Sequence, residues 1–402
     1  MRKYRFGSRE IQSDDPSFPA AVEAAYKNKN SVRAECLCNP PACLPMYVTK
    51  QNDRYILKRM PNTGEGHASG CDSYESPATL SGLGQVLGSA IKEDPDSGLV
   101  TLKFDFSLSK AAGRAPPAPS DKQGDTVKTD GTRLTLRGTL HYLWDQAGLT
   151  RWMPGMVGKR SWSLVRHYLL EAARDKTGKG FDSFERLLYI PEPFQAEKKS
   201  EIAQRRITRL LPAVAQSKGP RKLMIAIGEI KALEPSRYGY KIIFKHLPDY
   251  PFMLNEDIYN RLKKRFSSEL EVWQGLQQSH LISISTFSLG TTHVASIEEI
   301  ALMNVTENWI PFEGMLDKVL IDAMTEDHQR FTKGLRYNMP ASKPLACLSA
   351  LDTTPPTAMY IVQPGSGEEH EAELNELIDS STQSSWLWVV ENGEMPLLPR
   401  AH

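Results

Sequence analysis

The sequence of 402 residues contains no long hydrophobic run and only five cysteines. No window approaches about 18 uninterrupted apolar residues, and no apolar run follows the basic residues of the start, MRKYRFGSREIQSDDPSF. These absences predict a cytoplasmic protein with no membrane span and no secretory signal. Because a reducing cytoplasm disfavours structural disulfides, the odd number of cysteines favours another role for them.

The chain also has almost no overall charge, since its formal net charge is +1. The charges are nevertheless segregated: residues 133–179 carry a net charge of +6, whereas residues 313–402 carry −8. Clustered cations attract polyanions such as DNA and RNA, so the basic region is a candidate for nucleic-acid binding. The acidic region is expected to meet a different partner or the basic region itself.

The composition, 40% hydrophobic and 24% charged, is ordinary for a globular protein, and the length suits two or three domains. Ala, Pro, Gly and Asp are abundant over residues 109–132, as in a linker. We therefore predict an α+β multidomain protein. Its parts are a zinc-knuckle β-hairpin module at 1–108, the linker, a basic helical domain at 133–219 and an α/β domain at 220–402.

Apolar periodicity locates the secondary structure of these parts. Residues 78–93 predict an amphipathic segment, and the alternation in LVTLKFDFSL predicts a strand. In the α/β domain we expect strands at RKLMIAIGEIKAL, YGYKIIFKHL and HLISISTFSL, with a helical stretch between the last two.

The end of the chain has the element order of a nuclease core. A helix is predicted at 314–330, followed by strands at LACLSAL and TAMYIVQP, an acidic helix and a last strand at WLWVV. This order is similar to the restriction-endonuclease-like fold. Leu345 stands where an active nuclease would have its aspartate, and Tyr360 and Val362 stand where it would have its Glu-x-Lys pair. We therefore predict a degenerate core that does not cleave.

The cysteines are concentrated near the N-terminus. Cys36 and Cys38 lie in ECLCNPPACLP, and Cys71 lies in GEGHASGC together with His67. The intervening MYVTKQNDRYILKRM predicts a β-hairpin that turns at 51–53 and brings the two pairs together.

Three thiolates and one imidazole form the closed tetrahedral set that structural zinc prefers. We therefore predict a structural zinc site whose ligands are Cys36, Cys38, His67 and Cys71. Two alternatives remain open. Cys43 could replace one of the first two cysteines, or the cysteines could be ordinary small buried residues without a metal.

The basic region contains two segments with apolar residues at helical spacing, TRLTLRGTLHYLWDQAGL and SWSLVRHYLLEAARDK, the second with Ser161 placed as N-cap. With the strand-like FERLLYIPEPF they match a winged-helix outline. Clustered cations and a helix start both favour phosphate oxygens. The predicted nucleic-acid-binding residues are Arg151, Trp152, Lys159, Arg160, Trp162 and Arg166. The alternative is that the tryptophans are core residues and the charges form a solvated face.

A rival hypothesis is a metal-dependent nuclease that uses Glu229 and Lys231, which follow the apolar strand LMIAIG. Nucleases of the PD-(D/E)-x-K type place such a pair beside an aspartate, but no aspartate is evident at the expected distance upstream. A solvent-facing ion pair is the other interpretation. Since no nucleophile elbow, P-loop or H-E-x-x-H motif is present, we predict no catalytic residue.

Four blocks of the sequence together resemble the uncharacterised bacterial domain-of-unknown-function family 1173 over nearly the whole chain. These blocks are CLCNPP with RMPNTGEGHASGC, LRGTLHYLWDQAGLTRWMPGMVGKRSW, IGEIKAL with YGYKIIFKHLPDYPFML, and VTENWIPFE. The resemblance implies a role on integrative and conjugative elements or plasmids of proteobacteria, but it brings no activity and no catalytic residues. The four predicted zinc ligands are the positions that we connect with a zinc motif of this family.

We therefore expect a zinc-stabilised DNA-binding or DNA-processing accessory protein of a mobile genetic element, without catalysis. Its partners would be nucleic acid and a protein encoded by the same element. Besides the nuclease, a third hypothesis is a protein-interaction scaffold whose acidic C-terminal face binds a basic partner.

Overall fold

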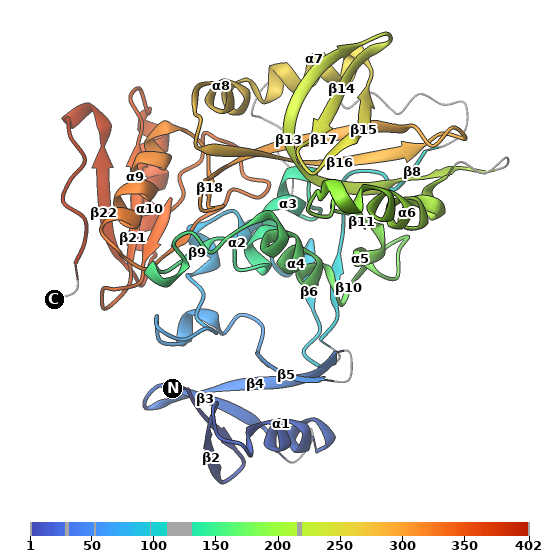
Figure 1. Cartoon of the computed structure of the whole chain (residues 1–402). Helices are drawn as coiled ribbons and strands as arrows, with labels where there is room; N and C mark the ends of the chain where they lie inside the picture. Colours follow the sequence, from blue (N-terminus) through green and yellow to red (C-terminus); the bar gives the residue numbers. More distant parts are fainter. Residues whose placement is uncertain are drawn as a thin grey trace.

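A computed structural model of the chain describes residues 2–28, 32–51, 54–96, 98–110, 131–214 and 219–400. Most of the predicted linker at 109–132, and the turn residues 52 and 53, lie outside these ranges. The protein is a mixture of helices and strands in three main sheets, one N-terminal, one central and one C-terminal (Figure 1). Among the helices that the structure describes, none combines the length and the hydrophobicity needed to cross a bilayer.

The N-terminal sheet has five strands in the order β2-β1-β3-β4-β5. The strands are β1 (Lys3–Phe6), β2 (Arg9–Gln12), β3 (Ala34–Asn39), β4 (Ala42–Gln51) and β5 (Arg54–Arg59). The predicted hairpin is confirmed, because β4 and β5 pair antiparallel from Met46↔Arg59 to Gln51↔Arg54. Helix α1 (Phe18–Lys27) covers the sheet and buries Val22 and Ala25 in a small apolar core.

Short elements connect this sheet to the rest of the chain. They are α2 (Leu83–Val86), β6 (Ile91–Glu93), β7 (Val100–Leu102) and β8 (Ser109–Lys110). The amphipathic segment expected at 78–93 is thus a broken series and not one helix. At Gly82 the backbone of this segment leaves no room for a side chain, because a Cβ there would lie 1.8 Å from the carbonyl oxygen of Arg336.

The central sheet closes on itself. Its strands follow the order β13-β14-β15-β17-β16, and β16 pairs back onto β13. All neighbours are antiparallel except β15 and β17, which are parallel. The strands are β13 (Met224–Ser236), β14 (Gly239–Phe244), β15 (Leu247–Leu254), β16 (Ser279–Leu289) and β17 (Ala295–Thr306). We call this five-stranded unit the barrel; it lies at the top of Figure 1.

Two helices join the third and fourth strands of the barrel, α7 (Glu256–Arg265) and α8 (Ser267–Gly275). The start of α7 is set by Asn255, whose side chain accepts a hydrogen bond from the amide of Ile258 at 2.8 Å. Acidic residues in its first turn and basic residues in its last turn complement the helix dipole. Ile258 and Leu262 point into the core of the barrel.

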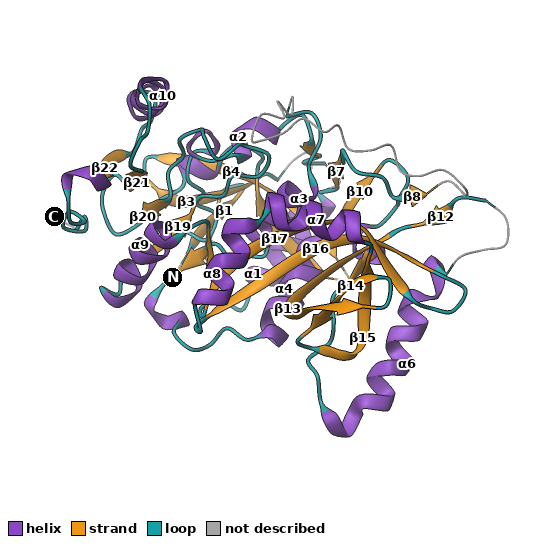
Figure 2. Cartoon of the chain, turned by 90° about the horizontal axis from the view of Figure 1, so that it is seen from above, coloured by secondary structure: helices purple, strands orange, loops and turns teal. Residues whose placement is uncertain are grey.

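The basic middle region forms α3 (Leu136–Gln146), α4 (Trp162–Ala173), α5 (Phe184–Leu187) and α6 (Lys199–Leu210), and α6 projects from the body in Figure 2. Both long helices predicted from periodicity are present. The strand-like FERLLYIPEPF is not a wing, because β11 (Leu188–Tyr189) joins β13 in parallel beside the barrel. Strand β10 (Lys176–Gly178) pairs with β7, and β12 (Arg221–Lys222) pairs with β8.

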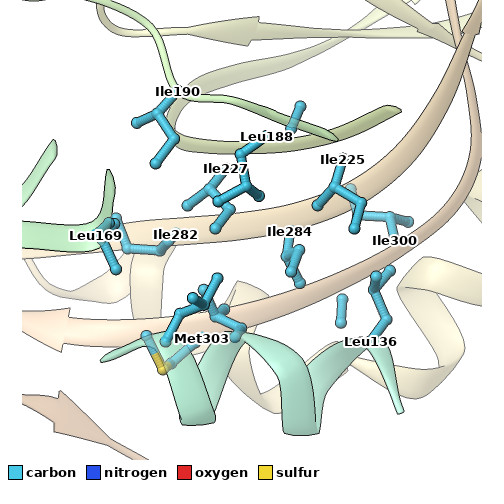
Figure 3. Close-up of a cluster of buried hydrophobic side chains, with 14 of the residues drawn as sticks. Leu136, Leu169, Leu188, Ile190, Ile225, Ile227, Ile282, Ile284, Ile300 and Met303 are labelled. Atoms are coloured by element: carbon cyan, nitrogen blue, oxygen red, sulfur yellow. The ribbon is translucent and has the colours of Figure 1, made fainter. Parts of the chain in front are cut away.

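One hydrophobic core joins the middle helices and the barrel. Figure 3 shows Leu136 and Leu169 of the helices against Ile227, Ile282 and Ile284 of the strands, all of them buried. The domain boundary predicted at 219–220 does not separate two cores, because this core includes residues on both sides of it, such as Ala213 and Met224. Burial of both faces explains the continuous apolar run at the start of β13, where Met224, Ile225, Ala226 and Ile227 are all buried.

The C-terminal unit contains α9 (Met315–Glu326), β19 (Phe331–Lys333), β20 (Leu348–Ala350), β21 (Thr357–Val362), α10 (Glu368–Asp379) and β22 (Ser384–Val389). Its sheet has the order β22-β21-β20-β19-β9, where β9 (Arg151–Trp152) comes from the middle region. Strand β20 is antiparallel to both neighbours, and β22 is parallel to β21. The short β18 (Pro311–Phe312) pairs with β17 and leads from the barrel into this unit.

Candidate functional site

The four predicted metal ligands lie together where β3, the central strand of the N-terminal sheet, meets the loop at 64–75. Cys36 and Cys38 are alternate residues of β3 and therefore point to the same side. His67 follows a short 3-10 turn, Gly64–Gly66, and Cys71 comes four residues later in the same loop. The four ligand atoms all lie within 4.8 Å of one another. The structure thus brings together the four residues that the sequence predicts as metal ligands, in a group that could hold a metal ion.

The distances fit a tetrahedral ion. The Sγ atoms of Cys36 and Cys71 are 3.9 Å apart, and Nδ1 of His67 lies 3.3 Å from Cys38 Sγ and 3.8 Å from Cys71 Sγ. Ordinary zinc–sulfur and zinc–nitrogen bond lengths separate tetrahedral ligand atoms by about 3.5 to 3.8 Å. Four protein ligands leave no position for water, so the group suits a structural and not a catalytic metal.

The surroundings favour the thiolate form at Cys71, whereas burial raises the pKa of Cys38. A hydrogen bond shared with Cys36 lowers the pKa of Cys71 to about 5, and the same interaction raises the pKa of Cys36. The amide of Ala68 donates to Cys38 Sγ at 3.3 Å, and the amide of Ser73 donates to Cys71 Sγ at 3.4 Å. Such donors stabilise the ionised sulfur that a metal requires.

The histidine also presents the right nitrogen. His67 is buried with its Nδ1 toward the thiols, and its Nε2 has no hydrogen-bond partner among the residues that the structure describes. Cys43 stands apart from the group: it is exposed, and its Sγ accepts a hydrogen bond from Nη1 of Arg5 at 3.1 Å. The alternative in which Cys43 is a ligand therefore has no geometric support.

The loop at 64–75, which carries His67 and Cys71 and which we call the candidate metal loop, is also a contact between the N-terminal sheet and the rest of the protein. Arg151 donates to the carbonyl oxygens of Asp72, at 2.7 Å, and of Tyr74. Nε2 of Gln383, just before β22, donates to the hydroxyl of Tyr74 at 2.8 Å. The loop thereby joins β3 to β9 and to the C-terminal unit.

Both tryptophans of the predicted nucleic-acid site are core residues. Trp152 is 1% exposed and belongs to the apolar core of the C-terminal unit. Trp162 is 4% exposed, and its indole N–H donates to the carbonyl oxygen of Pro191 at 2.8 Å. The structure agrees with the alternative interpretation of these residues and leaves no aromatic face at this place for a base.

The arginines of that predicted site donate hydrogen bonds to backbone carbonyl oxygens. Arg160 donates to the carbonyl oxygens of Leu149 at 3.0 Å and Asn308 at 3.2 Å, and its burial lowers its pKa to about 10. Arg166 donates to the carbonyl oxygen of Ile190 at 3.1 Å. Arg151 donates to the candidate metal loop, and of the six residues only Lys159 is exposed. The six residues therefore do not form one accessible surface.

Glu229 and Lys231 do not face each other. A bulge between Ile230 and Ala232 shifts the alternation of β13, so Glu229 is 5% exposed while Lys231 faces solvent. Glu229 instead accepts hydrogen bonds from His280 Nδ1 at 2.7 Å and Lys245 Nζ at 2.8 Å.

Lys231 lines a cavity of about 440 Å³ with Lys263, Tyr259 and Trp273 of α7 and α8. The nuclease hypothesis requires Glu229 and Lys231 to project to the same side of β13, and in the structure they do not. Sequence spacing could not reveal His280 or Lys245, because neither lies near Glu229 in the chain.

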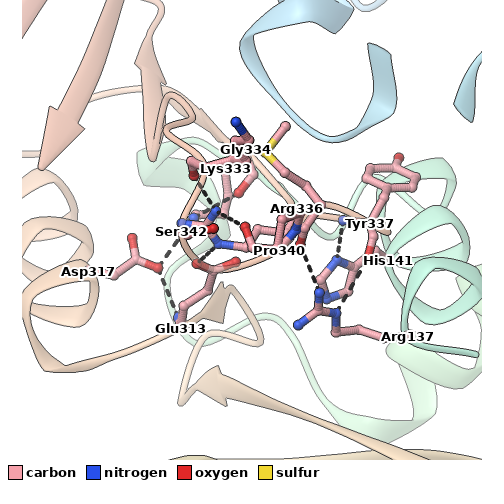
Figure 4. Close-up of polar contacts among 12 residues, drawn as sticks. Arg137, His141, Glu313, Asp317, Lys333, Gly334, Arg336, Tyr337, Pro340 and Ser342 are labelled. Atoms are coloured by element: carbon pink, nitrogen blue, oxygen red, sulfur yellow. Dashed lines mark hydrogen bonds and ion pairs between the residues drawn. The ribbon is translucent and has the colours of Figure 1, made fainter. Parts of the chain in front are cut away.

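A second group of charges, shown in Figure 4, holds the loop between β19 and β20. Lys333 is 3% exposed and lies 3.3 Å from Asp317, and Arg336 is paired with Glu313 at 2.5 Å. Burial works to lower the pKa of Lys333, but Asp317 and the neighbouring acidic groups raise it overall.

From the side of α3, Arg137 donates to the carbonyl oxygens of Tyr337 at 3.3 Å and Met339 at 2.9 Å. His141 accepts from the amide of Tyr337 at 2.9 Å. Since the two arginines of this group are committed to carboxylates or carbonyl oxygens of the loop, the group has a structural role at the junction of α3 and the C-terminal unit.

Comparison with known proteins identifies one family. No curated protein and no solved structure gives a significant match to the chain. The family described as protein of unknown function (DUF1173) matches residues 4–391, which is nearly the whole chain. The protein is therefore a member of domain-of-unknown-function family 1173.

Proposed function

We propose that this protein is a zinc-stabilised DNA-binding accessory protein of a bacterial mobile genetic element, and that it does not cleave DNA. The observation that carries the proposal is the C-terminal unit. Its helix, three antiparallel strands, second helix and parallel last strand follow the order of a restriction-endonuclease-like core. A fold alone does not give an activity, so the residues at the catalytic positions decide between binding and cleavage.

Those positions are apolar and buried. Leu345 is 5% exposed, Tyr360 1% and Val362 8%, so none of them offers a carboxylate or a lysine to a metal ion. Glu229 and Lys231, the other nuclease candidate, do not share a side of β13, because Lys231 lies in the bulge between Ile230 and Ala232. A unit with this element order and without catalytic groups at these positions suits a protein that holds DNA.

Zinc is the metal that we propose for the Cys36, Cys38, His67 and Cys71 group, because three thiolates and one imidazole form a closed structural set. Its role here is to order the loop that Arg151 and Gln383 contact. The mobile-element role follows the family resemblance.

A binding titration and a cleavage assay test this function together. Fluorescence anisotropy with labelled single-stranded and duplex oligonucleotides should show binding that weakens as salt is raised. Incubation of plasmid with the protein and Mg²⁺ or Mn²⁺ should leave the plasmid intact. Absence of binding at low salt would refute the binding role, and metal-dependent cutting that purified Glu229→Ala protein lacks would establish the nuclease instead.

A further inference from the structure

The barrel has a strand order with a known use. Numbered along the chain, its five strands pair as 1-2-3-5-4-1, strands 3 and 5 are parallel, and helices α7 and α8 lie between strands 3 and 4. This is the topology of the small barrels that bind oligonucleotides and oligosaccharides across strands 2 and 3, between the loop joining strands 1 and 2 and the loop joining strands 4 and 5. The likeness rests on topology, so the residues must show whether the surface can bind.

The first of these loops carries an exposed aromatic ring. Strands β13 and β14 are joined by Arg237 and Tyr238, between the paired residues Ser236 and Gly239. Tyr238 is 79% exposed, and the guanidinium of Arg237 lies 5.2 Å from the centre of its ring. Gly239, with φ of +109°, supplies the positive φ at the turn, so the turn does not require a tyrosine.

The face between the loops is mixed in character. On β14, Lys241 and Ile243 are half-buried, and on β15 Met253 is half-buried opposite Lys241. Their neighbours Ile242 and Phe252 are fully buried in the core of the barrel, so the half-buried residues form its outer face. At the other end the β16–β17 loop presents Val294, which is 45% exposed. The surface thus offers an aromatic ring, two cations and apolar patches.

We propose, as a refinement that rests on the proposed function, that the outer face of β14 and β15 and the Arg237–Tyr238 loop bind single-stranded nucleic acid. An exposed ring is a platform on which an unpaired base can stack, and Arg237 offers positive charge to the adjacent phosphates. Lys241 lies 3.1 Å from Glu234, so it contributes its charge where a phosphate takes the place of that carboxylate. Stacking on one ring reads no particular base, so the site has little sequence preference. A duplex hides its base faces and gains only the phosphate contacts.

The test compares loop variants with matched surface variants of the whole chain. The probe is a fluorescein-labelled oligo(dT) of 20 nucleotides, and a duplex of the same length is titrated as the second probe. Tyr238→Ala is expected to raise the Kd for the single strand about tenfold. Arg237→Ala is expected to lower the slope of log K against log salt by about 0.7. Tyr168→Ala, at a tyrosine of α4 that is 42% exposed, and Lys198→Ala, at an exposed lysine outside both candidate surfaces, serve as controls and should leave both values unchanged.

The outcomes separate this inference from the function on which it rests. If the unmodified protein binds neither probe at low salt, the proposed function fails. If it binds but prefers the duplex, or if Tyr238→Ala binds as well as the unmodified protein, the barrel surface is refuted while DNA binding stands. Loss on Lys231→Ala and Lys263→Ala without loss on the loop variants would place the strand at the α7–α8 cavity instead. Thermal unfolding of each variant checks that the substitutions at these exposed positions leave the fold intact.

Discussion

The N-terminal sheet and the barrel differ in the size and chemistry of what holds them together. The apolar core of the N-terminal sheet is small, and two of its buried members, Cys36 and Cys71, belong to the group that could hold a metal ion. The core of the barrel draws on buried residues from Val86 to Tyr337. A small module buries too little apolar surface to offset its conformational entropy and commonly needs a metal, whereas a large core does not. The comparison explains why the ligands lie where they do.

Removal of the metal should have the largest effect, and it should be confined to the N-terminal sheet. Structural zinc contributes on the order of 10 kcal/mol in zinc-finger peptides, more than a small core can replace. Chelation, or His67→Ala, should therefore open β3 and the loop at 64–75. Hydrogen exchange resolved along the chain should rise there and stay low in β13 and β16. Equal protection of the N-terminal sheet from hydrogen exchange with and without metal would show that the metal does not stabilise this sheet.

Truncation in the barrel should give the next largest effect, independent of metal. Ile284 is fully buried on β16, and Ile284→Ala removes apolar contacts and leaves a cavity that costs about 2 to 5 kcal/mol. Urea unfolding should show this loss in the presence and absence of chelator. A loss that appears only in chelator would mean that the two cores are not independent.

Loss of a buried charge in the barrel should have a smaller and pH-dependent effect. Burial works to raise the pKa of Glu229, but the hydrogen bonds from His280 and Lys245 outweigh it and hold that pKa below the ordinary value. The ionised form therefore favours folding, and its contribution is present above about pH 4.3 and is lost as pH falls through the lower folded pKa.

Glu229→Gln should cost about 1 to 3 kcal/mol at pH 7 and should remove this part of the acid dependence. The control is Glu234→Gln, at a half-exposed carboxylate on the same strand that is paired with Lys241. It should change stability by less than about 0.5 kcal/mol. The measurement is urea unfolding from pH 3 to pH 7, and identical pH profiles for Glu229→Gln and the unmodified protein would contradict this account of the pair.

The smallest effect is expected at the cysteine outside the metal group. Cys43 is exposed and contacts Arg5, so Cys43→Ser should change the free energy of unfolding by less than about 0.5 kcal/mol. Metal content should be unchanged. A drop in bound metal would return Cys43 to the set of ligands and sharpen the description of the site.

The metal group could be predicted from the sequence because its geometry is local. A hairpin between 46 and 58 suffices to bring Cys36 and Cys38 to the loop with His67 and Cys71. The barrel could not be predicted, because its closure depends on the pairing of β13 with β16 and of β15 with β17.

Two of its strands are also obscured in the sequence. Strand β17 contains adjacent charges at Glu298 and Glu299, and β15 contains Pro248 and Pro251, which usually argue against a strand. In the structure Glu298 is paired with Lys110 at 2.8 Å.

Charge counts do not show which cations are free to bind a partner, for a similar reason. The net charge of residues 133–179 is +6, but Arg151, Arg160 and Arg166 donate to backbone carbonyl oxygens of distant loops. A sequence shows that a cation is present and does not show its partners. The Arg237–Tyr238 loop, which we propose as a binding site, could not be predicted because two residues at a hairpin turn have no periodic pattern.

The account depends most on the metal at the N-terminal sheet, and elemental analysis of the purified chain measures it directly. Inductively coupled plasma mass spectrometry should find one zinc per chain, and the double variant Cys36→Ser, Cys71→Ser should contain none. Protein that is folded and free of transition metal, or a double variant that keeps its zinc, would contradict the account.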